Sequence, residues 1–143
     1  MGLACTGSGA LFALVMSKEQ HPDTGLRGMV VPVTPLQQNC SILWCTKTNK
    51  GAVIDPGGDL DQILGAVEQN GLTLEKILVT HAHIDHAGGV AELAERLELP
   101  IEGPHMEDQF WIDRLEESGE KYGINARTFA PGRWLDGHDT VTI

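Results

Sequence analysis

The sequence predicts a single α/β domain built on a mixed sheet. β-Prone runs alternate with helical patterns between residues 50 and 97, and this alternation is typical of α/β proteins. The chain has 143 residues, 41% hydrophobic and 21% charged, which suits one globular domain. No apolar run approaches the ~20 residues that span a bilayer. We therefore expect one buried core and no membrane-spanning segment.

The first 28 residues are expected to be a disordered or non-native N-terminal extension, with the domain over residues 29–143. Residues 10–16 (ALFALVM) have the apolar character of an export signal. No Lys or Arg precedes them, however, and no small-residue cleavage site follows. This argues against export, and we expect a cytoplasmic protein.

Three strands are expected at the start of the domain. Residues 29–34 (MVVPVT) form a β-branched run, residues 35–39 carry a turn, and residues 40–46 (CSILWCT) form the second strand. A third apolar run, in GAVIDPGG at 51–58, ends at Asp55 because Asp-Pro-Gly-Gly is a strong turn sequence.

A helix and a fourth strand are expected next. Asp59 or Asp61 is positioned to cap a helix that runs to about Asn70, and Gly71 ends it. Residues 76–80 (KILVT) form the following strand.

A second helix is predicted from about His86 to Leu97, because Val90, Leu93, Ala94 and Leu97 recur at helical spacing. Residues 100–102 predict a short strand.

The last third of the chain predicts a helix and a hairpin. Residues 106–119 form an acidic amphipathic pattern that is expected to bury Phe110, Trp111 and Leu115. Residues 134–143 (WLDGHDTVTI) are typical of a hairpin.

Charge and cysteine content restrict the partners and the compartment. The formal net charge of −10 disfavours binding to nucleic acid or to an anionic membrane surface, although part of it could serve a cation site. Cys5, Cys40 and Cys45 are odd in number and lack metal or redox spacing, so we expect buried thiols in a reducing compartment. Cys40 and Cys45 are five apart on one strand, face opposite sides and are not expected to bridge.

The strongest functional signal is a cluster of three histidines and one aspartate within six residues: His81, His83, Asp85 and His86. On a helix, His81 and His83 would point about 200° apart, whereas in an extended segment both reach one metal ion. Asp85 and His86 are aimed differently and suit a second ion. Two neighbouring ions activate water for hydrolysis, and Gly88 and Gly89 permit close backbone packing beside them.

Two alternatives stay open for the aspartates. Asp85 could be a helix cap beside surface histidines, although a cap does not require three histidines at this spacing. Asp55 could orient the histidine loop through hydrogen bonds or serve only as a turn residue. His21, His105 and His138 are isolated and are not expected to be ligands.

Two motifs carry a resemblance to a known family. THAHIDH at 80–86, preceded by DPGG at 55–58, resembles the metallo-β-lactamase superfamily, and PVTPLQQNCSILWC at 32–45 resembles its glyoxalase II-like (hydroxyacylglutathione hydrolase-like) branch. The resemblance covers residues 29–143 and implies an αββα sandwich, of which this chain holds mainly the N-terminal half. The resemblance therefore implies that the chain is C-terminally truncated relative to that family, whose remaining ligands would follow Ile143.

The resemblance also implies roles for the cluster. His81 and His83 would bind one metal ion and Asp85 and His86 a second, usually zinc, with iron or manganese as alternatives. Asp85 would also steer protons as a catalytic residue, and the substrate would be a small-molecule glutathione thioester. The alternatives are a persulfide dioxygenase-like enzyme with one iron and a non-catalytic fragment. With only these four ligands, we expect the chain alone to hold zinc weakly.

Overall fold

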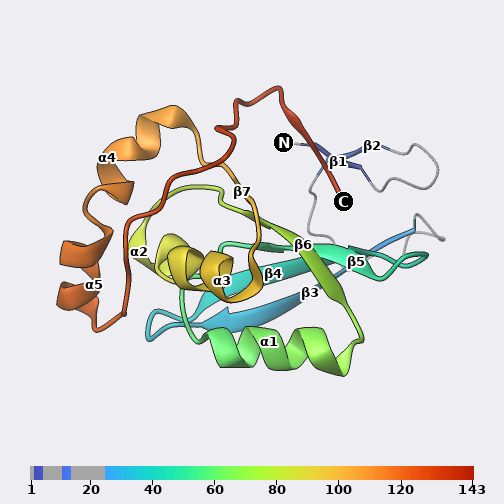
Figure 1. Cartoon of the computed structure of the whole chain (residues 1–143), viewed down its shortest axis with the longest axis horizontal. Helices are drawn as coiled ribbons and strands as arrows, with labels where there is room; N and C mark the ends of the chain where they lie inside the picture. Colours follow the sequence, from blue (N-terminus) through green and yellow to red (C-terminus); the bar gives the residue numbers. More distant parts are fainter. Residues whose placement is uncertain (1, 5–10, 14–24) are drawn as a thin grey trace.

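The computed structural model describes residues 2–4, 11–13 and 25–143, and their strands form two sheets (Figure 1). The larger sheet has the order β3-β4-β5-β6-β7 and the smaller one β2-β1-β8. The strands are β1 (Gly2–Ala4), β2 (Leu11–Ala13), β3 (Leu26–Val33), β4 (Gln38–Cys45), β5 (Lys50–Ile54), β6 (Thr73–Leu78), β7 (Ile101–Glu102) and β8 (Thr140–Thr142). The helices are α1 (Leu60–Gln69), α2 (Ile84–Ala87), α3 (Val90–Leu97), α4 (Gln109–Ile112) and α5 (Leu115–Tyr122), with a 3₁₀ turn at Met106–Asp108.

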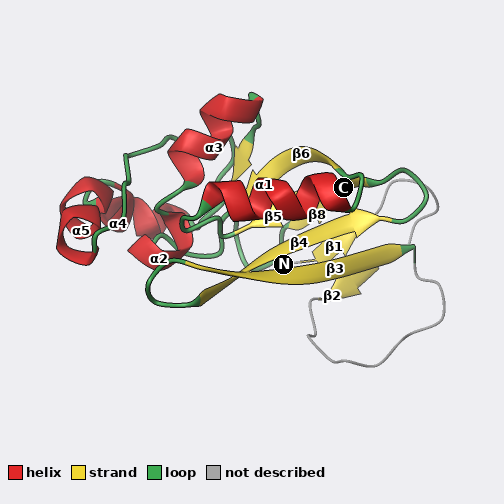
Figure 2. Ribbon diagram, turned by 90° about the horizontal axis from the view of Figure 1, so that it is seen from below, coloured by secondary structure: helices red, strands yellow, loops and turns green. Residues whose placement is uncertain are grey.

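The larger sheet is mixed, as the sequence predicts. β3, β4 and β5 are antiparallel neighbours, whereas β5, β6 and β7 run parallel. Successive parallel strands need crossover connections, and right-handed crossovers in one direction place their helices on the same face. Figure 2 shows α1 and α3 together on one face of this sheet. The carboxyl ends of β5 and β6 therefore open into two neighbouring loops.

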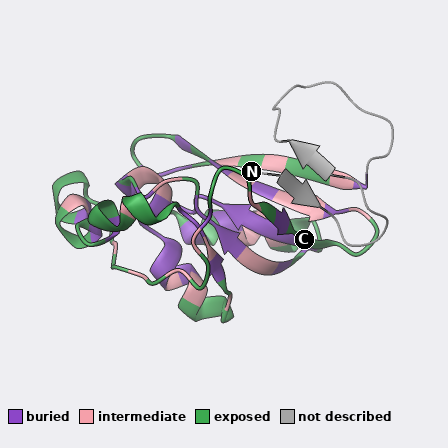
Figure 3. Ribbon diagram, turned by 90° about the horizontal axis from the view of Figure 1, so that it is seen from above, coloured by how far each residue is buried: buried purple, intermediate pink, exposed green. Residues whose placement is uncertain are grey.

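The core has two parts because strand residues alternate between the faces of the sheet. On the helix face, Val53 and Ile77 pack with Ile63 and Leu93 of the helices. On the opposite face, a second cluster consists of Ala52, Ile54, Leu78, Leu135, Val141 and Ile143. Figure 3 shows buried positions concentrated in the sheet and exposed ones at the α4–α5 end.

The helix predicted from His86 to Leu97 is divided into α2 and α3. The division falls at Gly88 and Gly89, which pack against the turn that follows β5. The Gly89 backbone N–H donates to Pro56 O at 2.9 Å. The prediction of one continuous helix was wrong because the tertiary contact with this turn competes with helical geometry.

Asp59 precedes α1 as predicted but does not cap it through its side chain. Its Oδ2 instead accepts a hydrogen bond of 2.7 Å from the Thr34 backbone N–H, between β3 and β4. The carboxylate therefore joins two loops that are distant in sequence. At the other end, Gly71 has a φ of +61° beyond the end of α1, as a helix-ending glycine should.

The segment 106–119 does not form one amphipathic helix. It divides into the 3₁₀ turn, α4 and the start of α5, with the change of direction at Asp113 and Arg114. Leu115 is buried as predicted, but Phe110 and Trp111 are 50% and 43% exposed. The prediction for these two aromatic residues was wrong, because the break turns Ile112, rather than its neighbours, into the core.

The predicted hairpin at 134–143 is also wrong for the described part of the chain. β8 pairs in parallel with β1, with Leu3 opposite Val141. Among the described residues, Arg133 also forms an isolated bridge with Glu102. Burial of Val141 and Ile143 against the larger sheet holds this segment.

At the N-terminus, β3 begins at Leu26, three residues before the predicted start of the domain. The remainder of the predicted extension lies outside the described residues apart from β1 and β2, so its disorder or non-native origin stays a prediction. Within the described ranges, no helix is long and apolar enough to cross a membrane.

The cysteines follow the prediction in part. Cys40 is a free, fully buried thiol and does not bridge to Cys45. Cys45, however, is disulfide-bonded, so the prediction of buried thiols was wrong at this position. An odd count excludes complete pairing but leaves room for one bridge. Cys5 lies outside the described residues.

Candidate metal centre

The histidine loop, residues 80–86, follows β6: residues 80–83 link β6 to α2, with His83 in extended backbone, and residues 84–86 form the start of α2. Ala82 is 1% exposed and packs into the core. Its backbone N–H donates to Asp108 Oδ2 at 2.8 Å. Because side chains alternate along extended backbone, anchoring Ala82 inward directs His81 and His83 outward together. This is the extended geometry that the spacing predicts.

The Asp-Pro-Gly-Gly turn presses against the end of this loop, backbone to backbone. A Cβ atom on Gly57 would lie 1.6 Å from Asp85 O, and one on Gly88 would lie 2.5 Å from Gly57 O. A side chain at either position would displace the loop. The close packing expected at Gly88 and Gly89 is confirmed, and Gly57 is its tightest point.

Asp55, at the end of β5, is 5% exposed and has a left-handed φ of 55°. Its Oδ1 accepts from the Thr80 backbone N–H at 2.8 Å, and its Oδ2 accepts from Thr80 Oγ1 at 2.5 Å. Oδ2 also lies 2.9 Å from His86 Nδ1. Every one of these contacts joins the carboxylate to the histidine loop, and together they satisfy a buried charged group.

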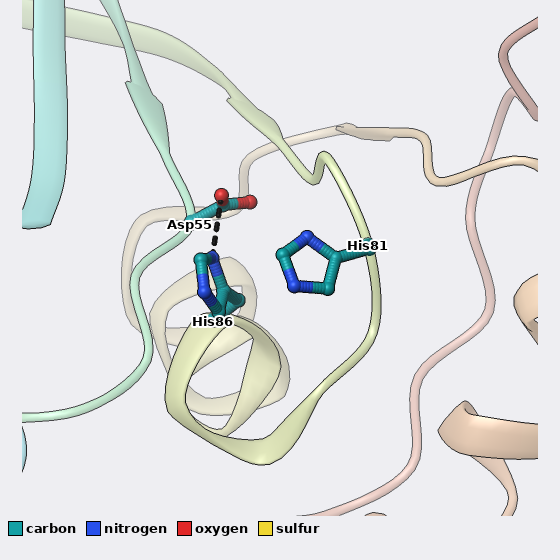
Figure 4. Close-up of side chains that lie close together, drawn as sticks. All are labelled: Asp55, His81 and His86. Atoms are coloured by element: carbon teal, nitrogen blue, oxygen red, sulfur yellow. Dashed lines mark hydrogen bonds and ion pairs between the residues drawn. The ribbon is translucent and has the colours of Figure 1, made fainter. Parts of the chain in front are cut away.

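His81 and His86 meet in front of Asp55 (Figure 4). Their ring centroids are 4.0 Å apart, and one ligand atom from each of Asp55, His81 and His86 lies within 4.8 Å of the others. His83 stands beside them, with its ring centroid 4.7 Å from that of His81. The Asp85 Oδ2 atom lies 3.5 Å from His86 Nε2. The structure thus brings His81 and His86 together with Asp55, while the predicted ligands His83 and Asp85 lie beside this group.

The two central histidines differ in their electrostatic surroundings. The hydrogen bond that His86 donates to Asp55 raises the pKa of His86, against the opposing effect of burial. Burial, together with the neighbouring His86, lowers the pKa of His81 below its usual value. His81 is therefore mainly neutral at pH 7, which is the form that binds metal ions.

The donor set fits a divalent transition metal. A carboxylate only accepts hydrogen bonds, so His86 Nδ1 must be the protonated nitrogen facing Asp55, and Nε2 keeps its lone pair. A carboxylate behind a ligating imidazole is a common support in metal sites. The neighbouring Gln38 has a buried Oε1 without a hydrogen-bond partner among the described residues. Because the Gln38 side chain also lies beside His86, this oxygen is a free hydrogen-bond acceptor next to the candidate site.

The sequence alone did not assign four of the residues near the metal centre to the site: Thr80, Asp108, Gln38 and Trp111. The Trp111 ring packs edge-to-face on His83 at 4.9 Å between centroids. Thr80 is the first residue of the loop, and its position in THAHIDH was the available signal. Asp108, Gln38 and Trp111 are distant in sequence, so only the fold reveals their proximity.

Relatives of this chain include metallo-hydrolases. The hydroxyacylglutathione hydrolase GloC of Haemophilus influenzae is 36% identical over 108 residues, which cover 75% of this chain and 50% of that protein. The probable metallo-hydrolase YqgX of Bacillus subtilis is 30% identical over 115 residues, 79% of this chain and 53% of that protein. The chain thus spans about half the length of these relatives.

Solved structures agree on the fold. A structure of TTHA1623 in a di-iron-bound form has a TM-score of 0.70 and 30% identity, covering 79% of this chain and 56% of that one. The BLEG-1 B3 metallo-beta-lactamase has a TM-score of 0.68 and 28% identity, covering 82% and 56%. The family model of the metallo-beta-lactamase superfamily matches residues 33–143. This chain belongs to the metallo-beta-lactamase superfamily.

Proposed function

We propose that this chain carries metal ligands of a metal-dependent hydrolase of glyoxalase II type that acts on a glutathione thioester. The observation that carries the proposal is the convergence of His81 and His86 in front of Asp55, with ligand atoms within 4.8 Å of one another. Several relatives named hydroxyacylglutathione hydrolase support the thioester as substrate, with identities of 36% and 40% in two of them.

In this proposal, His81 and His83 hold one ion and Asp85 and His86 hold a second. Asp55 orients the loop rather than ligating, because its oxygens already accept three hydrogen bonds from it. Zinc suits imidazole and carboxylate ligands, while the di-iron form of TTHA1623 supports iron as an alternative. The chemistry that a bound divalent ion supplies is activation of water and polarisation of a carbonyl.

The remaining residues position the substrate and a proton. The Asp85 carboxylate, 25% exposed and beside His86 Nε2, is proposed to accept a proton at Oδ2. Trp111 forms an apolar wall on the exposed side of His83, where the non-reacting part of a small substrate can pack.

The proposed partner is a small molecule rather than nucleic acid or a membrane surface, in keeping with the net charge of −10. A cytoplasmic location stays a prediction.

The test compares the parent chain with His83→Ala and with a matched control, His138→Ala, which removes an exposed histidine outside the loop. Zinc affinity is measured by chelator competition, and hydrolysis is measured with S-lactoylglutathione. We expect His83→Ala to weaken zinc binding about tenfold or more and any hydrolysis to fall with it, while His138→Ala matches the parent. Equal zinc affinity in His83→Ala would contradict the site. Oxygen-dependent turnover with one tightly held iron would contradict the hydrolase and support a persulfide dioxygenase.

A further inference from the structure

We infer that the Thr80 hydroxyl is a positioning group that sets the tautomer of His81 by linking it to Asp55. The inference rests on the proposed metal site but is independent of the substrate. Asp55 forms a hydrogen bond with His86 directly, whereas Thr80 supplies the hydrogen-bonded link to His81: Thr80 Oγ1 lies 2.5 Å from Asp55 Oδ2 and 3.0 Å from His81 Nδ1.

The direction of this chain of hydrogen bonds follows from counting protons. An ionised carboxylate has no proton to donate, so the single hydroxyl hydrogen of Thr80 must point to Asp55. The Thr80 oxygen is then an acceptor toward His81, and Nδ1 of His81 must carry the ring proton. In the neutral ring, Nε2 therefore keeps the lone pair that a metal ion requires.

The same carboxylate oxygen thus controls two imidazoles. Asp55 Oδ2 accepts from His86 Nδ1 at 2.9 Å and from the Thr80 hydroxyl. Both neutral rings then carry the proton on Nδ1 and the lone pair on Nε2. A free imidazole exchanges between its two tautomers, so this arrangement prepares both rings before any ion arrives.

The backbone keeps Thr80 in place independently of its hydroxyl. Its N–H donates to Asp55 Oδ1 at 2.8 Å, and the preceding Val79 N–H donates to Glu102 O at 3.0 Å. Replacing the hydroxyl with a methyl group leaves both bonds available. Thr80→Val therefore removes the link to His81 while preserving the shape of the side chain.

The experiment uses ¹⁵N NMR of the imidazole nitrogens in the metal-free chain, followed by zinc competition. Thr80→Val is compared with Thr80→Ser, which restores the hydroxyl, and with Thr128→Val at an exposed threonine outside the site. In Thr80→Val we expect His81 to become a tautomer mixture while His86 keeps Nδ1–H. We also expect zinc affinity to fall about 10–100-fold, the usual effect of losing such a supporting contact. Thr80→Ser should recover most of that loss, and Thr128→Val should match the parent.

An unchanged Nδ1–H signal for His81 in Thr80→Val would overturn the inference, as would a valine variant that binds zinc like the parent. Failure of the proposed metal site is distinguishable. If the parent chain binds no zinc, the site fails, while the tautomer comparison in the metal-free chain still decides the role of Thr80.

Discussion

The histidine loop with its neighbouring turn and the outer segment 106–122 differ in how the fold holds them. At the loop, backbone packs directly on backbone at Gly57, and a buried carboxylate is satisfied by three hydrogen bonds. In the outer segment, short helices expose Phe110 and Trp111 and are anchored mainly through buried apolar side chains. The backbone of the first region therefore has little room to shift, whereas the second region is attached to the core through a few buried side chains such as Ile112 and Leu115.

The two regions therefore meet different structural requirements: precise positioning of side chains in the first, and attachment to the core in the second. A ligand constellation requires positions held to fractions of an ångström, and close packing with directional hydrogen bonds supplies that precision. A wall beside the constellation needs only to stay nearby. Asp108 connects the two regions, since it lies at the start of the outer segment and holds Ala82 of the loop.

The largest expected effect comes from adding one methyl group to the loop region. In Gly57→Ala the new Cβ would lie 1.6 Å from the Asp85 carbonyl oxygen, which is a backbone atom without an easy escape. We expect destabilisation of about 4 kcal/mol or more, or loss of folding, by urea denaturation. The matched control is Gly65→Ala in α1, where nothing lies within 4 Å. It should be neutral or stabilising by about 1 kcal/mol, and equal effects of the two substitutions would refute the contrast.

The next prediction compares the stability lost at a buried residue of the outer segment, Leu115, with that lost at an exposed one, Trp111. Leu115 is 1% exposed, so Leu115→Ala should cost about 2–5 kcal/mol through lost burial and a residual cavity. Trp111 is 43% exposed, and Trp111→Ala should change stability by well under that amount. Thermal and urea unfolding of both variants measure the difference. A larger loss for Trp111→Ala would mean that the wall itself holds the segment.

The Cys40 thiol reports how completely the sheet beneath the site is buried. Burial, with a further effect of the Asp55 charge, raises the pKa of the Cys40 thiol to about 12 from 9.0. The folded state then keeps its proton while the unfolded state loses it, so above about pH 9 each pH unit should cost up to about 1.4 kcal/mol of stability. Cys40→Ala should lack this alkaline loss. A thiol reagent should label Cys40 at pH 8 only after unfolding, and rapid labelling of the native chain would contradict its burial.

The smallest effect concerns the histidines themselves. In the metal-free chain, the pKa of His86 should lie above the ordinary histidine value and that of His81 below it. The raised pKa of His86 means that its interaction with Asp55 stabilises the fold at pH values below the unfolded pKa, and that this contribution disappears as pH rises through the folded value. In Asp55→Asn the His86 pKa should fall, because burial alone lowers it. An NMR titration of both rings checks this, and an unchanged His86 in the variant would remove Asp55 as the cause.

Sequence patterns are informative where the physical cause is local. β-Branched and apolar runs bounded by turn residues predict β3, β4 and β5, and such local signals, like the Asp-Pro-Gly-Gly turn after β5, need no distant partner to be recognised. The spacing of His81 and His83 predicts an extended metal-binding loop for the same reason. Its extended geometry is confirmed, while the division of the ligands between two ions stays a prediction.

The errors share a non-local cause. The helix predicted from His86 to Leu97 divides because Gly88 and Gly89 meet the turn after β5. Trp111 is exposed beside His83 although its segment has an amphipathic pattern, because the chain changes direction after α4. Neither contact leaves a periodic signal in the neighbouring residues.

The sequence by itself determined the superfamily, the α/β class and the positions of four candidate ligands, because each depends on residue types at short, fixed spacing. Only the tertiary structure decided how Asp55 reaches that loop: directly at His86 and through the Thr80 hydroxyl at His81. The physical reason is that hydrogen bonds act over about 3 Å, whereas Asp55 and Thr80 are 25 residues apart in the chain. Parallel pairing of β5 with β6 brings them together.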